Sequence, residues 1–381
     1  MYVKKIKRLF LYGIFILFIG AALLPSTSSV PNQESVVLVL NKIWIVDDDG
    51  NDCYPLVPDF DDIQPAVDAA NNSDEIHVYA GEYNKTRINK ELLLFGGFNG
   101  TSLINNTDED GNTVSITAEN VLFDRFTVIN SGDEMDILPP FNRDAGVHVT
   151  AKGAVITNNT IINNNGNGIY SLVGSVEIRN NILNDNSYDG IGIYAEGTLS
   201  SPLIRNNEIK DNGLDGIYCW LVYKPRIYFN YISGNGFDAE YMCGIKLHRT
   251  RGGFGRTGEI QRNWIINNNG DGIYIKRYCF FNKIWENNIS GNSRHGIYFE
   301  DTSILNNIFE NDFIQNDDKY AYTRGCFINL WDKNYWDDIT GPIYRIPGRL
   351  FGIIPTFLDW DFNPAEKPYD YPMPETGPIP N

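Results

Sequence analysis

Aromatic and charged residues recur at fixed distances after a series of glycines in the middle of the chain. Tyr218, Lys246, Tyr274 and Tyr298 stand two positions after their glycines, and Trp220, His248, Lys276 and Glu300 stand four positions after them. Tyr and Trp rings can stack on sugar rings, and Lys and His can bind the carboxylates of an acidic polysaccharide. One interpretation is therefore a carbohydrate-binding groove. The other is ordinary strand preference, because aromatic residues are enriched on the outer face of any β-strand.

A basic, glycine-rich stretch extends from His248 to Arg256. Its arginines Arg249, Arg251 and Arg256 could clamp a uronate or a sulfate group. Long loops often carry function. A solvated loop with local ion pairs explains the stretch equally well, so both interpretations stay open.

The sequence offers one weak candidate for a metal site. Asp47, Asp49 and Asp52 resemble a calcium-binding loop, although the bidentate Glu that such a loop places further on is absent. Three Asp residues near a Gly also suit an ordinary turn. The four His and four Met residues form no cluster, which argues against copper and other soft metals. We therefore expect no cofactor, with a structural calcium ion as the exception.

Paired carboxylates for glycoside hydrolysis would have to lie about 5–10 Å apart. Asp189, Asp215 and Asp271 are candidates, because each one directly precedes one of the glycines and the three can stack in one column. Their expected place is at turns. The sequence therefore assigns no catalytic residue.

A repeat of about 25 residues positions all these side chains. The pattern N-x-[I/L/F]-x-x-N marks seven successive repeats, and a Gly followed by an apolar residue keeps step with it. The first asparagines are Asn159, Asn181, Asn207, Asn230, Asn263, Asn287 and Asn311, and the glycines are Gly146, Gly168, Gly190, Gly216, Gly244, Gly272 and Gly296. Segments after the glycines alternate in polarity, which predicts short strands. Three such strands in each coil predict an all-β parallel β-helix of about ten coils.

The positions one and three after each glycine are expected to face the interior. The first of these columns contains Val147, Ile169, Ile191, Ile217, Ile245, Ile273 and Ile297. Cys219 belongs to the second inward column, so we expect it to fill the core. The asparagines are expected to form left-handed corners and hydrogen-bonded stacks from coil to coil, which makes them structural residues.

Composition restricts the partners and the compartment. The chain has 381 residues, with 48 Asp and Glu against 31 Lys and Arg and a net charge of −17, which disfavours nucleic-acid binding. Five Cys residues without a C-x-x-C pair form neither a disulfide scaffold nor a zinc motif. A basic start followed by an apolar run over residues 9–24 predicts a secretory signal or a membrane anchor. We expect the rest of the chain outside the cell or at its surface, touching the membrane only through this segment.

The chain is expected to comprise four parts. Residues 1–30 are the signal or anchor, 44–110 form an N-terminal cap and the first coils, 111–340 form the β-helix, and 341–381 form a tail rich in Pro and aromatic residues. The segment Phe60–Ala70 predicts a short helix, capped by Asp61 or Asp62, whose apolar face covers the first coil.

Four segments carry a resemblance to a known family. Ile45–Gly50, the helix and Ile76–Tyr83 resemble the opening of right-handed β-helix proteins of the pectin-lyase-like superfamily with PbH1 repeats, often called NosD-like, and Asn334–Asp338 resembles a closing motif. The resemblance covers about residues 44–340 and implies a right-handed helix. It also implies that a substrate groove would lie on the sheet that follows the glycines. It does not choose an activity, because the superfamily contains lyases, hydrolases, epimerases and non-enzymatic surface proteins.

The leading hypothesis is an exported surface protein that binds carbohydrate or another cell-surface partner. The candidate binding residues are Tyr218, Trp220, Lys246, His248, Arg249, Arg251, Tyr274, Lys276, Tyr298 and Glu300. One alternative is a polysaccharide-active enzyme, a lyase rather than a hydrolase, and another is a NosD-like accessory protein for metal-site maturation. Convergence of the Lys, His and Glu residues within about 6 Å of one substrate would favour the enzyme, and a scattered arrangement would favour binding.

Overall fold

The computed structural model describes residues 41–108, 110–135, 143–195, 201–237, 242–250, 258–326, 328–337, 341–350, 354–355 and 359–378. The chain divides into two units, residues 1–40 and 41–381, and every described residue belongs to the second. The predicted signal or anchor segment therefore lies outside the described residues. Within the described ranges, no helix is long and apolar enough to cross a bilayer.

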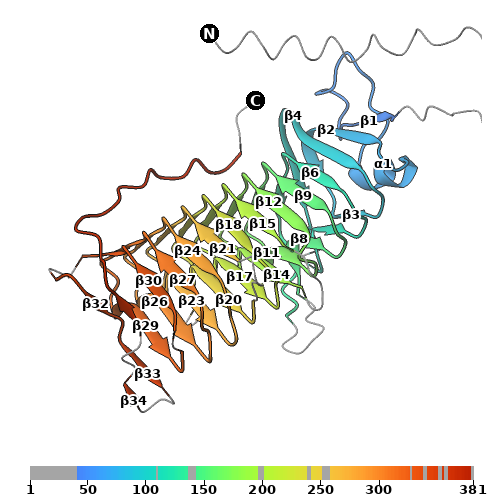
Figure 1. Ribbon diagram of the computed structural model, residues 1–381. Coiled ribbons are helices and arrows are strands. Elements are labelled where there is room, and N and C mark those ends of the chain that lie inside the picture. The colour runs from blue at the N-terminus through green and yellow to red at the C-terminus, as the bar shows by residue number, and fades with distance from the viewer. Residues whose placement is uncertain are drawn as a thin grey trace, which may run out of the picture. The chain divides into compact units, whose positions relative to one another are not determined.

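Short strands stack in successive coils (Figure 1). One regular coil contributes β17 (Ile217–Trp220), β18 (Arg226–Tyr228) and β19 (Tyr231–Ser233), and the next coil repeats this order. Each of these strands pairs in parallel with its equivalents in the neighbouring coils. The predicted all-β solenoid of about ten turns is confirmed.

Two sheets run along the stack. Sheet B contains β3 (Thr86–Ile88), β5 (Val114–Ile116), β8 (Ala145–Val149), β11 (Asn167–Ser171), β14 (Ile191–Tyr194), β17, β20 (Ile245–His248), β23 (Ile273–Lys276), β26 (His295–Glu300), β29 (Lys319–Arg324), β33 (Gly348–Leu350) and β34 (Ile354–Pro355). Sheet A contains β1 (Ile43–Val46), β2 (Glu75–Tyr83), β4 (Leu93–Asn105), β6 (Leu122–Asp124), β7 (Thr127–Ile129), β9 (Ala154–Thr157), β10 (Thr160–Ile162), β12 (Val176–Arg179), β13 (Ile182–Asn184), β15 (Leu203–Arg205), β16 (Glu208–Lys210), β18, β19, β21 (Glu259–Gln261), β22 (Trp264–Ile266), β24 (Lys283–Trp285), β25 (Asn288–Ser290), β27 (Asn307–Phe309), β28 (Asp312–Ile314), β30 (Leu330–Asp332), β31 (Tyr335–Trp336), β32 (Tyr344–Arg345) and β35 (Trp360–Asp361).

The interior is an aliphatic stack. Residues of the first predicted column, such as Ile217, Ile245 and Ile273, are fully buried and lie in register on neighbouring strands. Cys219, in the second inward column, is buried as predicted. The preceding glycines are required by close packing, because a Cβ at Gly216 would lie 2.7 Å from the carbonyl oxygen of Gly244.

Two long ladders of buried asparagines run along the corners of sheet A. The first contains Asn159, Asn181, Asn207, Asn230, Asn263, Asn287, Asn311 and Asn334, and the second contains Asn164, Asn186, Asn212, Asn235, Asn268, Asn292 and Asn316. Asn263 illustrates the pattern, because its Nδ2 donates to Asn287 Oδ1 at 3.0 Å and to the carbonyl oxygen of Ile227 at 3.0 Å. Each rung satisfies amide groups that burial would otherwise leave unpaired. The predicted hydrogen-bonded stacks are confirmed.

The left-handed corners lie one residue before the ladder asparagines and are occupied by asparagine in only some coils. Positive φ values occur immediately before the ladder asparagines, for example at Phe229 (54°), Arg262 (54°) and Glu286 (55°). Asparagines do occupy some of these corners, as predicted, for example Asn158, Asn180 and Asn206, but the ladder asparagines themselves do not. The ladder needs the amide group of Asn, whereas the corner before it accepts several residue types.

The N-terminal helix covers the first coil. Helix α1 (Ile63–Ala69) is capped by the carboxylate of Asp62, which accepts a hydrogen bond from the N–H of Ile63 at 2.7 Å. Its buried residues Ile63, Ala66 and Val67 form the predicted apolar face, and the helix contacts β1, β2 and β3.

An aspartate ends the first asparagine ladder at the other end of the stack. Asp361 in β35 accepts hydrogen bonds from Asn334 Nδ2 at 3.1 Å and from the indole N–H of Trp336 at 3.2 Å. A carboxylate thus takes the place of the next asparagine side chain.

Beyond this strand, residues 363–378 run back along the coils, and we call them the C-terminal strap (Figure 1). The N–H of Tyr369 donates to both oxygens of the buried Asp312 at 3.1 Å. Further along, the N–H of Gly377 donates to the carbonyl oxygen of Asn206 at 3.2 Å, and Asn206 Nδ2 donates to the carbonyl oxygen of Glu375 at 3.0 Å. The strap therefore connects the last coils to the middle of the stack.

Candidate functional site

The outward residues of sheet B lie in the register that the glycine spacing predicted. In β17, β20, β23 and β26, the second column aligns Tyr218, Lys246, Tyr274 and Tyr298, and the fourth column aligns Trp220, His248, Lys276 and Glu300. We call the outward side chains of β14, β17, β20, β23, β26 and β29 the sheet B face. Parallel strands lie about 4.8 Å apart, so neighbours in these columns are close enough to interact.

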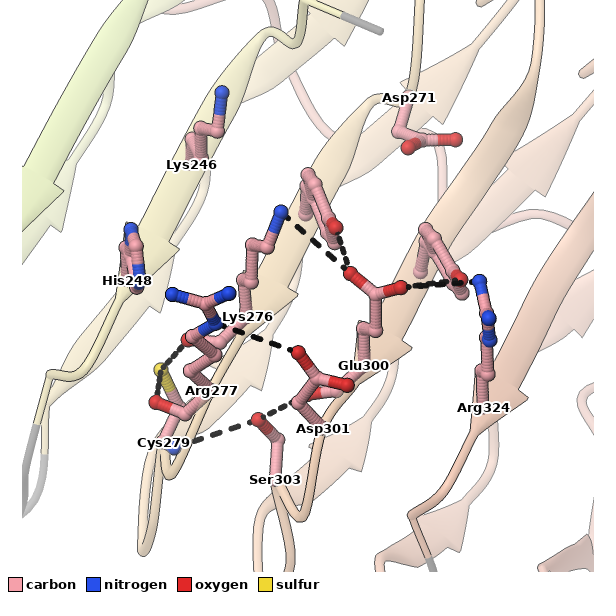
Figure 2. Close-up of polar contacts among 12 residues, drawn as sticks. Lys246, His248, Asp271, Lys276, Arg277, Cys279, Glu300, Asp301, Ser303 and Arg324 are labelled. Atoms are coloured by element: carbon pink, nitrogen blue, oxygen red, sulfur yellow. Dashed lines mark hydrogen bonds and ion pairs between the residues drawn. The ribbon is translucent and has the colours of Figure 1, made fainter. Parts of the chain in front are cut away.

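Glu300 is the centre of one polar cluster (Figure 2). Its carboxylate lies 3.7 Å from Lys276 Nζ and 3.4 Å from the guanidinium of Arg324, and it accepts hydrogen bonds from the hydroxyls of Tyr274 and Tyr298. The rings of these tyrosines stack with their centroids 5.0 Å apart. Both tyrosines are buried, so little of either ring is open for stacking on a sugar.

Lys246 belongs to a second cluster. Its ammonium lies 3.1 Å from the buried carboxylate of Asp215 and 5.3 Å from the ring centroid of Tyr218. Burial opposes the charge on Lys246, but Asp215 outweighs this effect and raises the pKa of the lysine above its usual range. Lys246 is therefore a fixed cation at neutral pH.

Tyr218 and His248 form a close pair beside this lysine, with the tyrosine hydroxyl 3.1 Å from His248 Nδ1. Burial and the charges of Lys276, Arg277 and Arg249 lower the pKa of His248 to about 4, so its ring is neutral at pH 7. Burial raises the pKa of Tyr218, which keeps the phenol protonated. The Nε2 atom of His248 is buried and has no hydrogen-bond partner within the described residues.

The four residues proposed to share one substrate do not meet at one point. Figure 2 shows Lys276 directed at Glu300, whereas Lys246 and His248 lie on the neighbouring strand outside that network of contacts. Arg249 contributes a backbone N–H to the carbonyl oxygen of Lys276 at 3.0 Å. Arg251 and Arg256 lie outside the described residues.

A buried ion pair that the sequence analysis did not assign adjoins the second cluster. The guanidinium of Arg143 lies 3.1 Å from Asp189 and covers the rings of Tyr170 and Tyr194. Burial raises the pKa of Asp189 to about 6, although Arg143 opposes the rise. Asp189 and Asp215 could be noticed because each precedes a glycine, but Arg143 stands outside the repeat and gave no signal.

The third aspartate of that column has basic partners of its own. Asp271 lies 3.2 Å from the guanidinium of Arg294 and 2.7 Å from Nδ1 of His295. Backbone N–H groups of the following coil also donate to these carboxylates, as that of Cys243 does to Asp215 at 2.7 Å. The column is therefore a structural ladder of carboxylates, closed by basic side chains on its outer side.

Family comparison identifies the fold independently. The chain matches the model of the right-handed β-helix region over residues 145–314 and 252–336, which together span half of its length. The chain belongs to the right-handed β-helix family. The resemblance to pectin-lyase-like proteins is confirmed, whereas nothing singles out the NosD-like branch. Among curated proteins, none matches the sequence significantly.

Solved structures show the same architecture. The A-module of a mannuronan C-5 epimerase from Azotobacter vinelandii is 14% identical, with 78% of this chain and 95% of that chain covered and a TM-score of 0.51. A lacto-N-biosidase from Eubacterium ramulus is 15% identical over 76% of this chain and 67% of its own, with a TM-score of 0.46. A pectate lyase is 14% identical over 78% and 80%, with a TM-score of 0.43. At these identities the likeness shows the fold and no shared site.

Proposed function

We propose that the sheet B face binds an acidic polysaccharide. The observation that supports this most is the distribution of charge. The strands of the sheet B face contain one acidic residue, Glu300, and four basic ones: Lys246, Lys276, Lys319 and Arg324. The chain as a whole carries a net charge of −17, so this face differs in sign from the rest of the protein. A polymer of uronates presents carboxylates at regular intervals, and such a basic strip would attract it.

The exposed ends of the basic side chains suit this role. Lys276 and Arg324 have side chains that are 29% and 58% exposed, and Lys319 is exposed as well. Although both side chains form ion pairs with Glu300, each has N–H donors beyond the one directed at that carboxylate. Half-buried rings of Tyr218, Trp220 and Tyr322 lie along the same columns and could contact sugar rings.

The fold comparison supports a glycan partner in general terms. The epimerase with the same architecture acts on mannuronan, a polyuronate, according to its name. No residue of its site is transferred to this chain. The proposal for this protein depends on its own charges and aromatic residues.

Binding of polyuronate and of a neutral glucan, measured by isothermal titration calorimetry, tests the proposal. The double variant Lys276→Gln/Arg324→Gln should bind polyuronate at least about tenfold more weakly, which corresponds to about 1.4 kcal/mol. The control Lys283→Gln removes a basic residue from the outer face of sheet A and should bind as the wild type does. Equal weakening in the control, or equally tight binding of the neutral glucan, would contradict the proposal.

A second function is favoured by one specific observation, the pair of Tyr218 and His248 beside the cation of Lys246. Lyases and epimerases of uronates begin by removing the proton α to the carboxylate. In one concerted step, the hydroxyl oxygen of Tyr218 could take the α proton of the substrate as the phenol passes its own proton to Nδ1 of the neutral His248, and Lys246 could stabilise the carboxylate as charge develops. Departure of the 4-O-linked sugar, protonated by the proton that His248 has received, would give an unsaturated product, and protonation of the carbanion by water from the opposite side would give the epimer.

Incubation with polyuronates, followed by NMR of the products, tests this second function. His248→Gln should abolish new unsaturated or epimerised residues while retaining polymer binding. The control His148→Gln changes a histidine of the same sheet that lies in a different column and should leave product formation unchanged. Wild-type protein that binds the polymer without altering it would leave binding as the function. No observation in the described residues favours a role in metal-site maturation.

We also propose that the protein is exported, and the only support for this is the N-terminal segment. A basic start and the apolar run over residues 9–24 support a cleaved signal or an anchor. N-terminal sequencing of the protein recovered from culture medium and from membranes distinguishes these outcomes. Recovery of the intact chain in the cytoplasm would contradict both.

A further inference from the structure

Three carboxylates meet in the loop that follows β1, outside sheet B. Asp47, Asp49 and Asp52 each offer one carboxylate oxygen, and these oxygens all lie within 4.8 Å of one another. No Lys, Arg or His among the described residues lies within ion-pairing distance of the three. Negative charges so close together repel one another, so the arrangement needs a compensating partner.

Asp47 shows most clearly that a partner is missing. It is 1% exposed, and its Oδ2 accepts a hydrogen bond from the N–H of Cys53 at 2.8 Å. Its Oδ1 is equally buried but has no hydrogen-bond partner within the described residues. A buried carboxylate oxygen that is left without a partner is unfavourable in free energy.

The other two carboxylates are held in place by amides. Asp49 accepts from the N–H and from Nδ2 of Asn51 at 2.8 and 2.7 Å, and Asp52 accepts from Asn99 Nδ2 at 3.1 Å. Each carboxylate oxygen has a second lone pair, so these bonds orient the groups without using all their acceptor capacity. The loop is thus pre-organised around a small space bounded by oxygen atoms.

We infer that Asp47, Asp49 and Asp52 bind a calcium ion. Ligands that are all carboxylate oxygens suit a hard cation, and they exclude the sulfur and imidazole sets typical of copper and zinc. Calcium accepts irregular geometry and completes its shell with carbonyl oxygens and water, whereas magnesium demands a near-ideal octahedron. The ion would neutralise the cluster and bind the orphan oxygen of Asp47. By holding Asp47, it would also fix Cys53 and the exposed segment after it, which includes Tyr54, Leu56 and Val57.

Thermal unfolding of the full chain in EDTA and in millimolar CaCl2 tests the inference. Calcium should raise the Tm of the wild type by about 3 °C or more, and the same concentration of MgCl2 should raise it much less. Asp47→Asn keeps an oxygen that can accept from Cys53, so its Tm in EDTA should equal or exceed that of the wild type. In calcium its Tm should fall below that of the wild type. A residue with a purely structural role would lower the Tm in both buffers.

Two further variants keep the test decisive if Asp47→Asn is poorly folded. Asp52→Asn keeps an oxygen that can accept from Asn99 and should lose the calcium-dependent shift. Asp61→Asn removes an exposed carboxylate just before α1 and should retain the shift, because it lies outside the cluster. A wild type without any calcium-dependent shift or calorimetric binding would overturn the inference. An equal loss in Asp61→Asn would also overturn it, because the effect would then be general screening of charge.

Discussion

The corners of sheet A and the outer face of sheet B obey opposite rules. At the corners, the same residue recurs in coil after coil, and Asn263 and Asn287 make the same contacts with their own neighbours. On the sheet B face, equivalent positions carry Tyr218, Lys246 and Tyr274, and each has different partners. The repeated ladder contacts are sufficient to specify the fold. Residue types at the outer positions of sheet B can therefore vary without loss of the fold.

This difference explains where chemistry can reside in a solenoid. A ladder residue is constrained by the coils on both sides, because each rung satisfies its neighbours. An outward residue on sheet B is constrained mainly by alternation, which sets its direction and leaves its type open. Substitutions in the two regions should therefore affect different properties, stability in the first and binding in the second.

The largest effect is expected from a charge placed inside the stack. Ile245→Asp puts an unpaired carboxylate at a fully buried position between Ile217 and Ile273. It should cost at least about 4–5 kcal/mol and abolish the cooperative thermal transition seen by circular dichroism. Ile245→Val, which keeps the site apolar, should cost about 1 kcal/mol. A cooperative melt close to that of the wild type would show that the assigned interior is incorrect.

Removal of one ladder amide should have the next largest effect. Asn287→Ala leaves the backbone N–H of Asn263 and the carbonyl oxygen of Ile260 without their partners. Each buried unpaired group costs about 1–3 kcal/mol, so we expect about 2–4 kcal/mol in urea unfolding. The control Asn288→Ala removes a half-buried neighbour on β25 and should cost less than about 1 kcal/mol. Equal costs would remove the distinction between the ladder and the outer positions.

Burial of Asp312 beneath the C-terminal strap should make the stability of the protein depend on pH. Burial raises the pKa of Asp312 to about 6, from a usual value of 3.8. The favourable contribution of the protonated form is complete below pH 3.8 and is lost as the pH rises through 6. Asp312→Asn can still accept from the N–H of Tyr369, so it should be more stable than the wild type by about 2–3 kcal/mol at pH 7 and similar at pH 4. A stability difference that does not change with pH would contradict this explanation.

The smallest effect on stability is expected on the sheet B face, together with a gain in binding. Glu300→Gln removes the carboxylate that competes for Lys276 and Arg324. We expect a change in stability of about 1 kcal/mol or less and polyuronate binding several-fold tighter than in the wild type. Calorimetry with the polymer and thermal unfolding measure the two quantities separately. Weaker binding would show that Glu300 contributes to the ligand site instead of opposing it.

The sequence was informative where the structure repeats. Ile245 and Asn287 could be placed because each recurs at the same point of several coils, so one alignment predicted their burial. Arg143 could not be paired with Asp189, because it precedes the regular coils and its partner lies 46 residues further along the chain. The preference of Asn for left-handed conformations predicted corners such as Asn180, but it could not predict the equivalent corners at Phe229 and Arg262.

The C-terminal strap changes how the coils of the β-helix can unfold. A solenoid made only of neighbour contacts can fray one rung at a time from an open end. Here the hydrogen bonds between Asn206 and residues 375–377 close a loop of 169 residues in sequence around the later coils. Loss of the last rung alone does not release this closure, so the final coils should exchange their amide hydrogens together with the middle of the stack and more slowly than the end of an unstrapped solenoid would.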